Sequence, residues 1–114
     1  MNDRFYSTLS LCMRAGKLAF GIDTVKETVK SGKVSLLLTA ADSSEKTVKE
    51  VAFLAEKNSI PHLKLDRTKS GLKTTIGKLT GVLAVTDDGL SSSLLKAASS
   101  VNRSTVHFTQ PSGL

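Results

Sequence analysis

Apolar residues recur with a helical period in five segments of the chain. Phe5, Leu9 and Cys12 share one face of a helix expected from about residue 3 to Arg14, and the Ala15-Gly16 pair would end it. Further helices are expected to start near Asp23, Asp42, Ser70 and Asp87. Thr24-x-x-Glu27 and Asp42-x-x-Glu45 would cap the second and third, and Asp87 or Asp88 the fifth. Leu72, Ile76 and Leu79 form the apolar stripe of the fourth.

Short apolar runs between these helices predict strands. The runs at 34–40 and 82–86 are almost continuously apolar, as expected for strands buried on both faces, and weaker signals lie at 17–20 and at 60–65, where Pro61 stands near the start. Val106 and Phe108 alternate around His107 and would add an edge strand. Strands that alternate with helices predict an α/β sandwich whose central sheet is covered on both faces.

Composition places the chain among ordinary globular domains. With 114 residues, 39% apolar and 23% charged, it fits one small domain, which excludes wholesale disorder. Apolar stretches of a few residues predict no membrane-spanning helix, and the charged N-terminus is not a signal peptide. One cysteine and two distant histidines predict neither a disulfide nor a metal site. We therefore expect a cytoplasmic protein without metal or cofactor.

The net charge of +6 comes from two segments. Residues 14–33 carry a balance of +3 and residues 64–78 a balance of +4, whereas the rest of the chain carries −1. A basic excess confined to loops and helix starts is typical of a site for a polyanion such as nucleic acid. The alternative is that these lysines only keep a small domain soluble.

Two expected helix starts combine this charge with free backbone donors. One follows Gly21, with Lys17 and Lys26 beside it, and the other lies near Ser70, with Lys69 and Lys73 beside it. A helix N-terminus presents unpaired N–H groups and partial positive charge, which suit phosphates and base acceptor atoms. The alternative is that Gly21 only relaxes a turn.

Signals for an enzyme are weak throughout the sequence. Gly71 to Lys78 resembles a phosphate-binding P-loop, but five residues separate its glycines where four are needed, and Leu79 takes the place of the magnesium-binding Ser or Thr. Cys12 falls on an apolar helix face, and Asp87-Asp88 suits a helix cap. No catalytic residue is expected.

The ordered set of motifs resembles the family of ribosomal proteins L7Ae and L30e, and its small bacterial YlxQ-like members above all. The resemblance covers roughly residues 3–98 and leaves a short C-terminal extension. The runs that carry it are Lys17-Leu-Ala-Phe-Gly21-x-Asp23-x-Val25, Leu36-Leu-Leu-Thr-Ala-Ala-Asp42-x-Ser44, Pro61, Leu72-x-x-x-Ile76-Gly77-Lys78 and Ala84-Val-Thr-Asp-Asp-Gly89-Leu. It implies a three-layer α-β-α sandwich with a central four-stranded mixed sheet.

This resemblance also implies the function. Members of this family bind RNA, usually at kink-turns or similar bent internal loops. There, unstacked bases expose edges that a regular A-form helix hides. The expected partner is therefore structured RNA, such as ribosomal RNA, with ribosomal proteins as a further class, and the chain is expected to be a single RNA-binding domain, monomeric when free. The RNA-binding residues expected on this basis are Lys17, Gly21, Ile22, Asp23, Thr24, Lys26, Asp42, Lys69, Leu72, Lys73 and Lys78. The alternatives are a protein-interaction module of the same fold that has lost specific RNA binding, and a small nucleotide-using enzyme.

Overall fold

Helices and strands alternate along the chain in the computed structural model, which describes residues 4–101 and 107–109. The helices are α1 (Arg4–Arg14), α2 (Ile22–Lys30), α3 (Glu45–Lys57), α4 (Lys69–Ile76) and α5 (Asp88–Val101). The strands are β1 (Leu18–Phe20), β2 (Leu36–Thr39), β3 (His62–Lys64), β4 (Val82–Val85) and β5 (His107–Thr109). Val106, the first residue of the expected edge strand, lies outside the described residues.

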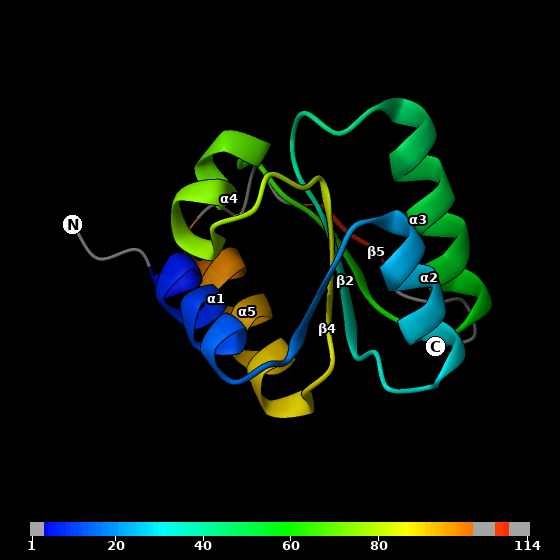
Figure 1. The fold of residues 1–114 in the computed structure, drawn as a ribbon, viewed down its shortest axis with the longest axis horizontal. Coiled ribbons are helices and arrows are strands. Elements are labelled where there is room, and N and C mark those ends of the chain that lie inside the picture. The colour runs from blue at the N-terminus through cyan, green and yellow to red at the C-terminus, as the bar shows by residue number, and fades with distance from the viewer. Residues whose placement is uncertain (1–3, 102–106, 110–114) are drawn as a thin grey trace.

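The strands form one mixed sheet in the order β1-β4-β2-β3-β5. β2 and β3 are parallel, and the other neighbouring pairs are antiparallel. Helices α1, α4 and α5 cover one face of the sheet, and α2 and α3 cover the other (Figure 1). The three-layer sandwich and its mixed sheet of β1 to β4 are confirmed, and β5 extends the sheet beside β3.

Two apolar cores, one on each face, hold the layers together. Along β2 the side chains alternate between them, since Leu36 and Leu38 pack toward α1, α4 and α5, whereas Leu37 packs toward α2 and α3. Cys12 is fully buried in the first core, as predicted. Burial, with the nearby Asp87 carboxylate as a second cause, raises the pKa of its thiol to about 11, which makes it a poor nucleophile.

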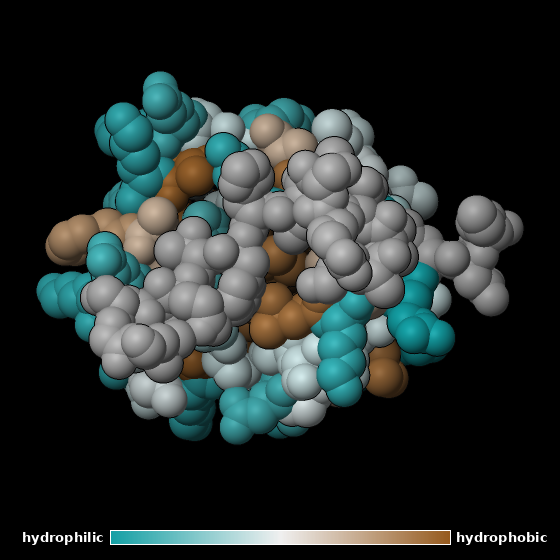
Figure 2. Space-filling view, turned by 180° about the vertical axis from the view of Figure 1, so that it is seen from behind, coloured by the Kyte–Doolittle hydropathy of each residue, from teal (hydrophilic) through white to brown (hydrophobic). Residues whose placement is uncertain are grey.

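Polar side chains rim the face of the molecule that lies opposite the view of Figure 1. Hydrophilic residues surround the face seen from behind, with apolar residues visible near its middle (Figure 2). Within the part of the chain that the structure describes, the exposed large apolar residues are Leu11, Phe53 and Leu79. None of the helices described is long and apolar enough to cross a membrane.

The cap of α5 is as predicted, but two other predicted caps are wrong. The Asp87 carboxylate accepts a hydrogen bond from the N–H of Leu90 at 2.8 Å. Helix α2 begins at Ile22 with Gly21 as its N-cap and no capping side chain, so no capping box forms at Thr24. Helix α3 is capped by Ser44 rather than by Asp42. Three successive polar residues precede α3, and the last of them has the extended backbone that a cap requires.

Helix α4 is shorter than its apolar spacing predicts. Gly77 adopts a left-handed conformation, with φ of 78°, and its N–H bonds to the carbonyl of Lys73, which ends the helix at Ile76. Leu79 therefore lies outside the helix, where it is 62% exposed. The segment from Gly71 to Lys78 is mostly helix and forms no P-loop.

A buried histidine makes stability depend on pH. His62 is 3% exposed, and its Nε2 lies 2.9 Å from the Thr39 hydroxyl. Burial, helped by the Lys64 charge, lowers its pKa from 6.5 to about 4. Below pH 6.5 the unfolded chain binds a proton that the folded chain does not, so stability should fall by about 3 kcal/mol between pH 6.5 and 4.

Urea unfolding at a series of pH values measures this loss. His62→Gln keeps a group that can hydrogen-bond to Thr39 and removes the titration. Between pH 6.5 and 4 the variant should therefore lose about 3 kcal/mol less stability than the wild type. An equal pH dependence in both proteins would show that His62 is not responsible.

Candidate nucleic-acid interface

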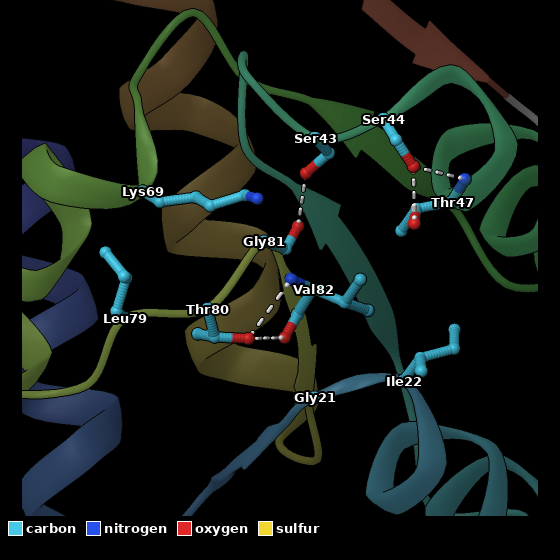
Figure 3. Close-up of a pocket in the computed structure, with 10 residues that line it drawn as sticks. All are labelled: Gly21, Ile22, Ser43, Ser44, Thr47, Lys69, Leu79, Thr80, Gly81 and Val82. Carbon is cyan, nitrogen blue, oxygen red and sulfur yellow. Dashed lines mark hydrogen bonds between the residues drawn. The ribbon is translucent and has the colours of Figure 1, made fainter.

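Three loops meet at one end of the sheet and enclose a pocket of about 320 Å³ (Figure 3). The first loop follows β1, the second follows β2 and the third precedes β4. Hydrogen bonds join them. The N–H of Gly21 donates to the carbonyl of Val82 at 3.1 Å, and the N–H of Ala40 donates to the carbonyl of Gly81 at 2.9 Å. The pocket is lined by Gly21, Ile22, Ser43, Ser44, Thr47, Lys69, Leu79, Thr80, Gly81 and Val82.

Helix α2 begins at this pocket with no capping side chain. The first-turn N–H groups of Ile22, Asp23 and Thr24 have no capping acceptor, whereas Ser44 caps α3 and Thr68 caps α4. The partial positive charge of this helix end therefore suits an incoming phosphate or base acceptor atom. Asp23 and Thr24 are exposed on the same turn.

Gly21 is required at this turn by its backbone conformation. Its φ of 84° and ψ of 151° fall in a region that residues with a side chain rarely adopt. A Cβ atom placed there would meet no atom within 4 Å, so a larger residue would be opposed by backbone strain and not by a clash.

Gly81 is required by close packing. A Cβ atom there would lie 2.5 Å from Ser43 Oγ and 3.1 Å from Lys69 Cε. The Ser43 hydroxyl donates a hydrogen bond to the carbonyl of Gly81 at 2.9 Å. Gly81 thus lets the loop after β2 and the Lys69 side chain approach the backbone in the pocket.

Lys69 extends across the pocket toward Gly81 and Ser43 (Figure 3). The Asp42 carboxylate accepts a hydrogen bond from its N–H at 2.9 Å, which ties the loop after β2 to the start of α4. Asp42 thus holds the backbone from which Lys69 projects. The Lys69 ammonium has no ion-pair partner among residues 4–101, so its charge is available to a ligand.

Leu79 adds an apolar side chain to the pocket. The i, i+4, i+7 spacing from Leu72 made it look like a core residue, and only the helix-ending role of Gly77 could have corrected this. The residues of the pocket that the sequence analysis missed are Ser43, Ser44, Thr47, Leu79, Thr80, Gly81 and Val82. Small polar residues in loops give no local signal for such a site.

Three further candidate lysines lie around the pocket, outside its lining. The Lys78 ammonium is 5.5 Å from the centre of the Phe20 ring, next to Gly21. Lys73 is exposed on α4, one helical turn beyond Lys69. Lys26 forms an ion pair with Glu50 across α2 and α3.

The candidate residue Lys17 lies away from this pocket. Lys17 precedes β1, four residues or about 13 Å of strand from Gly21, and its carbonyl accepts from the N–H of Thr86 at 3.0 Å. It lines a different hollow, together with Lys33 and Asp87, at the opposite end of the sheet. Lys17 and Gly21 therefore lie at opposite ends of β1.

The candidate residue Leu72 does not line the pocket. Its side chain is fully buried in the core beneath α4. It supports the helix that presents Lys69, and its side chain has no surface on which an RNA could pack.

No cluster of metal-ligating side chains occurs among the residues that the structure describes. The uncapped start of α2 and the Lys69 ammonium at the pocket suit an anionic or acceptor-rich ligand.

Comparisons with known proteins agree with this fold. The chain is similar to the large ribosomal subunit protein eL30B of Schizosaccharomyces pombe, at 35% identity over 91 residues, which is 76% of each chain. Its fold is similar to a protein with unknown function from Bacillus halodurans, with a TM-score of 0.79, 28% identity, and coverage of 85% of this chain and 98% of that one. It is also similar to a Giardia lamblia 15.5kD RNA binding protein, with a TM-score of 0.69 and 17% identity, over 90% and 92% of the two chains.

The family model of the ribosomal protein L7Ae/L30e/S12e/Gadd45 family matches residues 3–95, most of the chain. This confirms the family expected from the motifs, and a family of ribosomal proteins agrees with the expected absence of enzymatic activity. The chain belongs to the ribosomal protein L7Ae/L30e/S12e/Gadd45 family.

Proposed function

We propose that this protein is a single-domain, non-enzymatic RNA-binding protein of the ribosomal type, and that the pocket end of the sheet is its RNA interface. The observation that carries the proposal is that the uncapped start of α2 and the Lys69 ammonium face the same pocket. The ribosomal relative and the RNA-binding structural neighbour support the same partner class.

The chemistry of the pocket favours bent RNA over a regular duplex. The N–H groups of α2 and the Lys69 ammonium suit phosphates. The hydroxyls of Ser43 and Thr80 donate to the carbonyls of Gly81 and Val82, and their oxygens can accept hydrogen bonds from base edges. Leu79 offers an apolar surface to an unstacked base, which a regular A-form helix does not expose. A kink-turn or similar bent loop in cytoplasmic ribosomal RNA is therefore the proposed target.

Titration of a labelled kink-turn RNA, with an uninterrupted duplex of equal length as control, tests this function. The kink-turn RNA should bind more tightly because only it presents unstacked bases to the pocket. Equal binding of the two RNAs would contradict a bent target, and no binding of either would contradict RNA binding itself.

The salt dependence should reflect the cations around the pocket. If Lys26, Lys69, Lys73 and Lys78 each contact a phosphate, the logarithm of the binding constant should fall against the logarithm of salt concentration with a slope of about −3. Repeating the titration at several salt concentrations measures the slope. A flat dependence would contradict the phosphate contacts.

A further inference from the structure

The ion pair of Lys26 and Glu50 lies in the seam between α2 and α3, directly beyond the pocket. Lys26 is one helical turn along α2 from Ile22, and Glu50 lies one turn along α3 from Thr47. Ile22 and Thr47 both line the pocket. The seam therefore continues the surface of the pocket by one helical turn.

Both partners of this pair remain within reach of a ligand. The side chains of Lys26 and Glu50 are 42% and 39% exposed. Pairs exposed to this degree are weak, because water screens them and two long side chains must be held in one geometry. The pair can therefore open without disturbing the fold.

The charges of the seam are unusual for a polyanion-binding surface. The Glu50 carboxylate neutralises Lys26, and Asp23 adds a further negative charge nearby. The hydrogen bond and charge of Glu50 raise the pKa of Lys26, so its ammonium stays protonated. A phosphate that reaches the seam would meet a fully charged cation already held by a carboxylate.

We propose that the backbone of a bound RNA continues from the pocket over the α2–α3 seam, and that Glu50 competes with an RNA phosphate for Lys26. Free protein keeps the Lys26–Glu50 pair, and RNA binding replaces the carboxylate by a phosphate. Glu50 thereby lowers the affinity of the interface. This inference rests on the proposed RNA-binding function and adds a contact surface and an affinity-setting residue to it.

The test compares Glu50→Gln with Glu56→Gln. Both remove one negative charge from α3, but Glu56 is exposed near the other end of the helix and has no ion-pair partner within the described part of the chain. Affinity for a labelled kink-turn RNA is measured by fluorescence anisotropy over a range of salt concentrations, and thermal unfolding checks that each variant is folded.

Glu50→Gln should bind the kink-turn RNA about three- to fivefold more tightly than the wild type, the range expected when a weak exposed pair no longer has to be broken. Glu56→Gln should change the affinity by much less. Since the gain comes from Lys26, it should disappear in a Lys26→Met background, where Glu50→Gln should have no larger effect than Glu56→Gln.

Equal effects of Glu50→Gln and Glu56→Gln, with a wild type that binds, would overturn the inference and leave the proposed function intact. Weaker binding by Glu50→Gln would also overturn it, because the pair would then be positioning Lys26 for RNA. If Glu50→Gln still raised the affinity in the Lys26→Met background, Glu50 would act only by repelling the RNA. That result would also overturn the inference. A wild type that binds no RNA would instead refute the proposed function, and this inference with it.

Discussion

Replacing Lys69 by glutamate is expected to weaken binding to a kink-turn RNA at least tenfold, or about 1.4 kcal/mol. The side chain extends across the pocket beside the uncapped start of α2, so the variant places a carboxylate where a phosphate is expected. Folding should be retained, because the hydrogen bond from Lys69 to Asp42 uses the backbone N–H, and exposed or half-exposed lysines contribute little to stability.

Lys57→Glu provides the matched control for this substitution. It changes the net charge by the same amount but lies at the end of α3, about 15 Å along the helix from Thr47 in the pocket. It should reduce the affinity by only a small amount that salt screens. Equal losses for Lys69→Glu and Lys57→Glu would mean that binding is diffuse and that the pocket is not the interface.

Gly21→Ala is expected to lower the free energy of unfolding by about 2 kcal/mol, although the added methyl group meets no other atom. The cost comes from the backbone, whose φ of 84° and ψ of 151° a residue with a Cβ atom adopts only under strain. Relief of that strain would rotate the first turn of α2. The RNA affinity of Gly21→Ala should therefore also fall when it is measured under conditions in which the variant is folded.

Gly89→Ala adds the same methyl group where no such strain is expected. Gly89 lies in the first turn of α5 with an ordinary φ, and its Cβ would be 3.4 Å from an oxygen of Asp87. Urea unfolding should therefore show unchanged or slightly higher stability. If Gly21→Ala also left the free energy of unfolding unchanged, the backbone strain ascribed to Gly21 would be contradicted.

The layers of the fold were predictable because periodicity reports burial directly. Phe5, Leu9 and Cys12 on α1, and the apolar run of β2, are buried as their spacing indicates. Local signals failed where a distant residue decides the outcome. Asp42 looks like the cap of α3, but it bonds to the backbone of Lys69, 27 residues away.

The candidate site was predictable in part for the same reason. Gly21 and Lys69 carry signals of their own, as a glycine at a strand-to-helix turn and a lysine at a helix start, and both line the pocket. Charge counts along the sequence could not separate Lys17 from Gly21, because only the direction of β1 places them at opposite ends of the sheet. Nor could they show that Lys26 is paired with Glu50 from another helix.

The proposed location of the RNA interface is tested most directly by following the backbone amide resonances of the labelled protein while kink-turn RNA is added. The largest shifts should fall at residues 21–24, 43–47, 69 and 79–82, which surround the pocket. The hollow at the other end of the sheet, with Lys17 and Lys33, should change little. Shifts concentrated around Lys17 and Lys33, or spread evenly over the basic surface, would contradict an RNA interface at the pocket.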